Sequence, residues 1–183
     1  MMREDGLTVV ELIVVISIIG ILVVAFSSQF AGWRSGYTIE SQIKQMRSDL
    51  INARARAMQR ARIHFVTLAA TQYSLYEDTN PTPDGNGTLE VALDTRVLQT
   101  SLRAVYPITW SDLATTTLAF AQTGLPNVDM TICDNHSSPS LLQPDSTPDY
   151  DCIIIQATRL SLGKLTTHLH AGGTCDTGNC VAK

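Results

Sequence analysis

GLTVVELIVVISIIGILVVAF, residues 6 to 26, is an almost unbroken apolar stretch near the start of the chain. After Gly6, only Thr8, Glu11, Ser17 and Gly20 interrupt it. Twenty helical residues at about 1.5 Å each extend about 30 Å, which matches the hydrocarbon core of a bilayer. The stretch therefore predicts a helix that can cross a membrane.

Glu11 distinguishes this stretch from two commoner kinds of apolar segment. A cleaved secretory signal needs small residues at a cleavage site behind its apolar region, and Ala25 and Ser27 match that requirement only weakly. A plain membrane anchor does not explain a carboxylate near the start of the run, because charges inside a membrane are costly and usually functional. We therefore expect Glu11 to have a partner of opposite charge.

The residues after the apolar stretch continue the helical pattern. Apolar side chains recur at alternating spacings of four and three residues, which places them on one face of a helix. They are Ile39, Ile43, Met46, Leu50, Ala53, Ala57 and Ala61. Gly32 to Gly36 could bend the helix where it leaves the membrane. We expect this amphipathic half to pack its stripe on a globular head.

From residue 63 onward the pattern changes to short segments typical of β-strands. The expected strands are residues 63–68, 72–76, 88–93, 105–110, 117–121, 128–133 and 152–157. Asp84 to Gly87 is typical of a turn between the second and third strands, and residues 134–151 are typical of a polar loop. The predicted fold class is α+β, a long N-terminal helix packed on an antiparallel β head.

The net charge of -4 hides an asymmetry along the chain. Residues 34–62 contain seven basic and two acidic side chains, whereas the residues after Phe65 contain five basic and twelve acidic ones. The arginines of residues 54–62 suggest nucleic-acid binding, although a solvated charged face is commoner on a helix. The chain lacks a Gly-rich phosphate loop, H-E-x-x-H, G-x-S-x-G and C-x-x-C-H, so we expect neither an enzyme nor a cofactor.

Four cysteines fit an exported protein, whose compartment oxidises thiols. Their spacing alone leaves all three pairings open. We expect Cys175 to pair with Cys180 across a short loop, and Cys133 with Cys152 across the polar loop. The alternative is a zinc site, although its spacing matches no standard zinc motif. Its ligands would be His168, His170, Cys175 and Cys180. We expect the disulfides and no metal.

Residues 6–15, GLTVVELIVV, resemble the class III signal of type IV pilins and pseudopilins. In that family a polar leader ends in Gly, an apolar residue follows, and Glu stands at the fifth mature position. The resemblance implies that prepilin peptidase cuts between Gly6 and Leu7 and methylates the Leu7 amine. It also implies that Glu11 pairs with that amine in a neighbouring subunit. The chain has Leu7 where the family commonly has Phe, and only one basic residue in the leader.

A second set of motifs resembles the GspH/FimT type of minor pilin: a helix of the form ARxxAMxR, a strand, an F-x-x-x-G hairpin and a closing strand. These motifs lie in residues 50–61, 63–68, 118–124 and 152–163. The resemblance implies a low-abundance subunit at or near a filament tip. Some relatives bind DNA through a basic Gly-Arg motif. Here Thr158 stands in place of that Gly, and the following segment holds only Arg159 and Lys164.

These expectations combine into one organisation. The parts are a leader (residues 1–6), a transmembrane assembly helix (7–32), an amphipathic helix (33–62) and a β-rich head (63–183). The resemblance implies a structural or tip-initiating subunit of a type IV pilus or a type II secretion pseudopilus. It would sit in a bacterial inner membrane with a periplasmic head, and its partners would be other pilins, prepilin peptidase and lipid. The alternatives are a DNA-binding minor pilin used in DNA uptake, and a membrane-anchored lectin-like or sensor domain that needs neither Gly6 nor Glu11.

Overall fold

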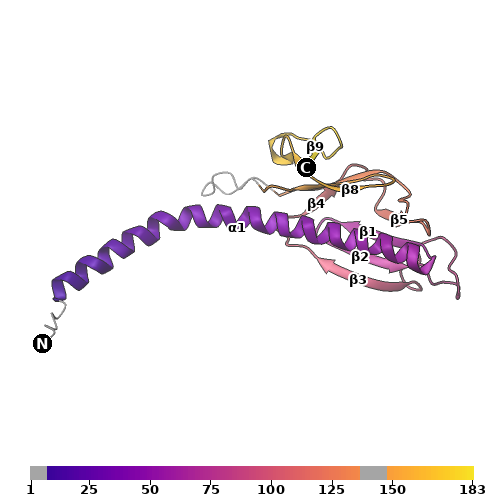
Figure 1. The fold of residues 1–183 in the computed structure, drawn as a ribbon, viewed down its shortest axis with the longest axis horizontal. Helices are drawn as coiled ribbons and strands as arrows, with labels where there is room; N and C mark the ends of the chain where they lie inside the picture. The colour runs from indigo at the N-terminus through magenta and orange to yellow at the C-terminus, as the bar shows by residue number, and fades with distance from the viewer. Residues whose placement is uncertain (1–7, 137–147) are drawn as a thin grey trace, which may run out of the picture.

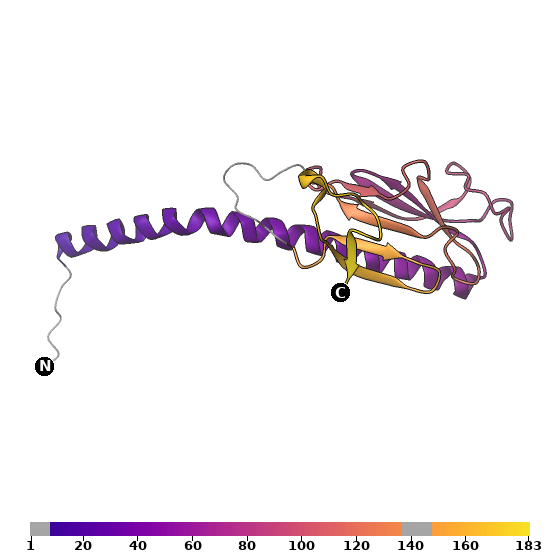
Figure 2. The ribbon, with the colours of Figure 1, turned by 90° about the horizontal axis from the view of Figure 1, so that it is seen from above.

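The computed structural model describes residues 8–136 and 148–183, without the side chains of residues 27–33. A long helix runs along two antiparallel sheets and projects far beyond them (Figure 1). Seen from above, the C-terminus lies at the head and the N-terminal end of the helix lies far from it (Figure 2). This architecture confirms the predicted α+β class.

Helix α1 comprises Val9–Arg60, 52 residues, and is about 78 Å long at the standard helical rise. It begins after Thr8, whose hydroxyl accepts a hydrogen bond from the Glu11 N–H at 3.3 Å. It ends at Ala61, which has a left-handed φ of 49° and donates its N–H to the Ala57 carbonyl. The prediction that the helix continues through its amphipathic half is confirmed. Ala61 itself is exposed beyond the helix end, so its inclusion in the apolar stripe is wrong.

The first sheet has four strands in the order β3-β2-β1-β5. They are β1 (His64–Ala69), β2 (Gln72–Glu77), β3 (Thr95–Ser101) and β5 (Thr117–Phe120). β1 and β2 form a tight antiparallel hairpin, and β5 pairs with the other edge of β1. Neighbours in this sheet are thus mostly neighbours in the sequence, as short connections favour.

Residues 88–93 do not form the strand expected of them. They belong to the loop between β2 and β3, where two buried carboxylates accept the hydrogen bonds that a neighbouring strand would otherwise accept. Asp78 accepts from the N–H groups of Asn86 and Gly87, at 3.2 and 2.7 Å. Asp94 accepts from the N–H groups of Thr79, Asn80 and Glu90. The loop is therefore ordered without belonging to a sheet.

The second sheet has five strands in the order β4-β6-β7-β8-β9. They are β4 (Ile108–Trp110), β6 (Met130–Asp134), β7 (Cys152–Ile155), β8 (Leu160–Leu165) and β9 (Cys180–Ala182). A short 3-10 helix, η1 (Leu169–Ala171), lies between β8 and β9. The sequence prediction did not include β8 or β9, nor β3 of the first sheet.

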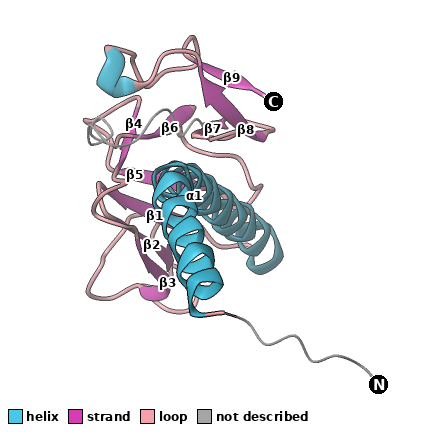
Figure 3. Ribbon diagram, turned by 90° about the vertical axis from the view of Figure 1, so that its left-hand side faces the viewer, coloured by secondary structure: helices cyan, strands magenta, loops and turns pink. Residues whose placement is uncertain are grey.

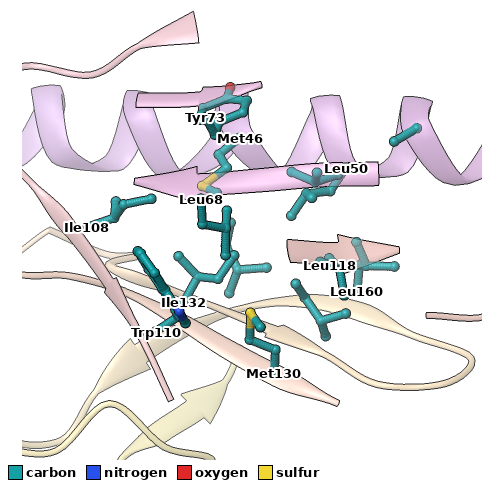
Figure 4. Close-up of a cluster of buried hydrophobic side chains, with 14 of the residues drawn as sticks. Met46, Leu50, Leu68, Tyr73, Ile108, Trp110, Leu118, Met130, Ile132 and Leu160 are labelled. Carbon is teal, nitrogen blue, oxygen red and sulfur yellow. The ribbon is translucent and has the colours of Figure 1, made fainter. Parts of the chain in front are cut away.

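The apolar stripe of α1 packs against both sheets. Each of its six buried members is 1% exposed or less: Ile39, Ile43, Met46, Leu50, Ala53 and Ala57. Figure 4 shows Met46 and Leu50 beside Leu68 of β1 and above Ile132 of β6. An end-on view places the helix in the angle between the two sheets (Figure 3). Because a buried Leu or Ile contributes about 1.5–3 kcal/mol, this stripe fixes the second half of α1 to the head.

Candidate functional site

The first half of α1 projects from the head (Figures 1 and 2). The large apolar side chains of Val9–Phe26 are exposed. Val9–Phe26 is long and apolar enough to cross a membrane, and none of it is buried. Ser35 is hydrogen-bonded to the Tyr106 hydroxyl of the head. Gln42 then donates to the Tyr106 carbonyl at 2.8 Å. An apolar surface of this length needs a cover, which must come from lipid or from other protein.

Glu11 lies in the first turn of α1, and its side chain is exposed. The N-terminal end of a helix carries a partial positive charge, which favours a carboxylate at this position. Gly6 and Leu7, the predicted cleavage and methylation positions, lie outside the described residues. The position of Glu11 leaves its carboxylate accessible to a group from another molecule.

Two disulfides join the four cysteines, and the expected pairing is wrong. The bonds are Cys133–Cys175 and Cys152–Cys180, with Cα separations of 5.8 and 6.2 Å. Cys133 and Cys152 do lie directly opposite each other on β6 and β7. Both side chains belong to a small apolar cluster outside the main core, and the segment after β8 folds back onto it. Each strand cysteine therefore meets a cysteine from this returning segment, a proximity that spacing along the chain does not reveal.

The disulfides also exclude the alternative zinc site. Cys175 and Cys180 are both oxidised, so neither offers a thiolate to a metal. The loop between them is closed by Asp176, whose carboxylate accepts from the N–H groups of Gly178 and Asn179 at 2.8 and 2.9 Å. The short loop thus needs no disulfide of its own.

The arginines that suggested nucleic-acid binding are largely engaged within the protein. Arg54 donates to the Thr158 carbonyl at 3.0 Å. Arg60 and Arg62 both bind the buried carboxylate of Glu77, at 2.6 and 3.2 Å. These contacts give the arginines a structural role at the end of α1.

The two candidate DNA-contact residues lie apart from each other. Arg159 is exposed in the turn between β7 and β8, whereas Lys164 lies near the other end of β8. Five residues of extended chain place them about 17 Å apart along the strand. They do not form one compact basic patch, so the geometry does not favour the DNA-uptake alternative.

A cluster of histidines and aspartates lies beside the disulfides. The imidazole rings of His136, His168 and His170 have centroids 5.1, 5.4 and 6.2 Å apart. Asp134 ends β6 and bonds the His136 Nδ1, and the Oδ2 of Asp151 lies 3.5 Å from the His168 Nδ1. Sequence reasoning placed His168 and His170 together in the alternative zinc site, but it did not connect them with His136, because that residue comes from a separate segment of the chain.

The surroundings of this cluster change the pKa of three of its groups. The hydrogen bond that the His136 ring donates to the Asp134 carboxylate raises the pKa of His136. Burial lowers the pKa of His168, and the carboxylate of Asp151 only partly offsets that effect. Burial also raises the pKa of Asp151. The cluster is therefore a set of electrostatically coupled groups rather than separate surface side chains.

Comparison with known proteins finds no protein-family model and no curated protein that matches the chain. Among solved structures, it is similar to the minor pseudopilin EpsH from the type II secretion system of Vibrio cholerae. That alignment has a TM-score of 0.49 and 10% identity, and covers 70% of this chain and 94% of EpsH. The chain is also similar to the type IV minor pilin FimU of Pseudomonas aeruginosa. Here the TM-score is 0.48 with 16% identity, over 68% of this chain and 87% of FimU.

Proposed function

We propose that this chain is a minor pilin-like subunit, a structural rather than catalytic protein that is held in a membrane and then built into a filament. The filament would be a type IV pilus or a type II secretion pseudopilus, with this subunit at or near its tip. The observation that carries the proposal is the division of α1 into two halves. Val9–Phe26 is uncovered, whereas the half that follows is fixed to the head by its buried stripe.

This division supports assembly because the same apolar surface serves two environments. In a bilayer the uncovered half is covered by lipid, since its length matches the hydrocarbon core. In a filament the same side chains are covered by the helices of neighbouring subunits. The head needs no rearrangement for this transfer, because its core is complete without the projecting half.

The oxidised cysteines support an exported head. Disulfides persist in the periplasm and outside the cell but are rare in the bacterial cytosol. Both bonds lie in the head, on the same side of any membrane that α1 crosses. We therefore place the leader, residues 1–6, in the cytoplasm and the head in the periplasm.

In this proposal, Glu11 sets the register of the subunit's helix along the helix of its neighbour in the filament. Processing between Gly6 and Leu7 frees the Leu7 amine, and a cation at this depth is the natural partner for a carboxylate in apolar surroundings. The pair would form between neighbouring subunits. It would fix how far one helix slides along the next.

Mass spectrometry of the N-terminus tests the processing step. The full chain is produced together with prepilin peptidase, and the mature protein is expected to begin with N-methylated Leu7. Gly6→Ala is the control, because it removes the residue that the peptidase needs and should leave the leader attached. A mature protein that begins at Met1 or after Ala25 would refute the proposal.

Crosslinking to other filament subunits in membranes tests the assembly step. We expect Glu11→Gln to reduce incorporation into filaments while the head stays folded, because the change removes a charge and no core contact. Ser17→Ala is the matched control, since Ser17 lies in the same uncovered segment and donates a hydrogen bond to the Ile13 carbonyl of its own helix, at 2.7 Å. Equal incorporation of the Glu11→Gln and control proteins would show that Glu11 does not set the register.

A further inference from the structure

We propose that His136, His168 and His170 form a binding site for a divalent transition-metal ion, with zinc as the reference ion. This site is separate from the membrane helix and goes beyond the proposed function. It also differs from the zinc site excluded above, because it uses no cysteine. Imidazole nitrogen is a ligand that suits zinc, copper and nickel.

The fold brings the three rings together and holds their segments covalently. His136 follows β6, and His168 and His170 belong to the segment that returns over the second sheet. The disulfides Cys133–Cys175 and Cys152–Cys180 tie this segment to β6 and β7. The backbone positions of the three histidines are therefore fixed before any metal arrives, which lowers the entropy cost of binding.

The ring separations suit three ligands of one ion. A nitrogen ligand about 2.1 Å from zinc places its ring centroid roughly 3 Å from the metal, and tetrahedral angles then separate two such centroids by about 5 Å. The observed separations are 5.1 Å for His136 and His170, 5.4 Å for His168 and His170, and 6.2 Å for His136 and His168. These separations place the three rings within reach of one ion, although the two that involve His170 change when its side chain rotates.

Two buried carboxylates stand behind two of the rings. Asp134 bonds the Nδ1 of His136, and Asp151 lies 3.5 Å from the Nδ1 of His168. Metal-binding histidines usually have a hydrogen-bonded partner of this kind, which orients the ring and leaves the Nε2 for the metal. The Asp134–His136 pair is such a bond, whereas Asp151 and His168 are within ion-pair distance only. In this structure both Nδ1 atoms face carboxylates, so both Nε2 atoms are the ones left for a ligand role.

The two carboxylates also need positive charge. Asp134 and Asp151 are 3% and 1% exposed. Within residues 8–136 and 148–183, the Oδ1 of Asp134 and the Oδ2 of Asp151 have no hydrogen-bond partner. Buried carboxylates without full compensation are unfavourable. A divalent ion on the adjacent rings would supply that compensation.

The rings are not yet arranged as a complete coordination sphere. In the part of the chain that the structure describes, no three ligating side chains are poised around one point, and His168 and His170 are stacked at an interplanar angle of 11°. The His170 side chain is exposed, so it can rotate without disturbing the core. Binding therefore requires the side chain of His170 to rotate out of this stack.

Zinc titration of the full chain in detergent micelles, prepared without a polyhistidine tag and stripped with chelator, tests the site. Carbon-13 labelling of the histidines allows each ring to be followed by nuclear magnetic resonance. We expect the signals of His136, His168 and His170 to shift together at one zinc per chain. His64 lies on β1, is fully buried and should not shift, so it is an internal control.

Three variants separate a built site from adventitious binding. His170→Gln should abolish the one-to-one transition. Because His170 is exposed, the variant should fold like wild type, which circular dichroism checks. Asp134→Asn should weaken zinc binding by about 10–100-fold, as expected for a residue that orients a ligand. Asp149→Asn removes an exposed carboxylate nearby and should leave the affinity unchanged. The proposal fails if wild type shows no ring shifts at about 1 mM zinc, if His64 shifts with the others, or if His170→Gln binds as tightly as wild type.

Discussion

Replacing Gly163 with Ala should destabilise the head far more than the addition of one methyl group suggests. Gly163 lies on β8, directly opposite Cys152 of β7, and the Cys152–Cys180 disulfide passes over it. A Cβ at this position would lie 2.7 Å from the Cys180 Sγ, 2.8 Å from the Val181 carbonyl oxygen and 3.1 Å from the Cys152 Sγ. None of these atoms is the free end of a flexible side chain, so the backbone or the disulfide must move.

The size of the effect follows from two opposing contributions. Ala is favoured over Gly in a strand by about 0.5–1 kcal/mol, because Gly loses more backbone entropy on folding. Overpacking typically costs about 1–3 kcal/mol. If the clash prevents the disulfide, the sequence separation of 28 residues implies a loss of about 3–4 kcal/mol in the chain-entropy model. We therefore expect Gly163→Ala to lower the free energy of unfolding by about 1 kcal/mol if the bond forms and by about 3 kcal/mol if it does not.

Denaturant unfolding followed by the fluorescence of the buried Trp110, together with non-reducing peptide mapping, measures both contributions. Gly20→Ala is the matched control, since a Cβ there meets no atom within 4 Å and should leave the head unchanged. In a Cys152→Ala, Cys180→Ala background the cost of Gly163→Ala should shrink, because two of the three close atoms are gone. An intact disulfide and an unfolding free energy equal to or above wild type would refute the steric argument.

Three further changes test the packing and electrostatics of the head, each by denaturant unfolding. Glu77→Gln should lower the free energy of unfolding by about 2–3 kcal/mol, because it leaves two arginines without their shared buried carboxylate. A change near zero would show that water takes the place of the carboxylate. Leu118→Ala should cost about 2–5 kcal/mol, because the side chain is fully buried in the main core; a loss below 1 kcal/mol would mean that the core collapses around the gap. Burial and a hydrogen bond to Asp49 raise the pKa of Tyr73, so its contribution is complete below about pH 10 and is lost as the pH rises toward the folded-state value. Wild type should therefore lose stability above pH 10 more steeply than Tyr73→Phe, and parallel pH profiles would contradict this.

The helix could be predicted from the sequence because its signals are local. The apolar run fixes the first half, and the spacing of the six stripe residues fixes which face of the second half meets the head. Both patterns are contained in short stretches of the chain, so they can be read without knowing which distant residues meet. Only the end was misjudged, where Ala61 leaves the helix in a left-handed conformation.

The strands show where local patterns stop being sufficient. Residues 88–93 alternate like a strand but form a loop, because the side chains of Asp78 and Asp94 accept backbone hydrogen bonds there. β8 was missed, because Gly163 inside it is typical of a break in a strand. Its true role is to make room for a disulfide between two other segments.

The cysteine pairs and the histidine cluster could not be predicted, for the same physical reason. Both depend on the return of residues 166–182 over the second sheet, and that return is fixed by tertiary packing. Pairing the cysteines nearest in sequence assumes that short loops close most easily, as loop entropy suggests. In the folded head Asp176 closes the short loop instead, and both cysteines of that loop bond to strands.

Comparing magnitudes explains how Glu11 can lie in a membrane helix at all under the proposed function. Fourteen large apolar side chains between Val9 and Phe26 are exposed in the described chain. We take about 1 kcal/mol of transfer free energy for each side chain, because the helix itself already covers part of its surface. Transfer of all fourteen from water into lipid or into a filament then gains about 14 kcal/mol. One carboxylate costs about 2.5–3.5 kcal/mol at the centre of a membrane helix and less near its end. Glu11 therefore cannot prevent insertion of the helix, but its cost is large enough to favour the one helix alignment in which a cation lies beside it. A charge of this size favours one alignment among several whose apolar burial is nearly equal, which is what packing against the similar apolar helices of other pilins requires.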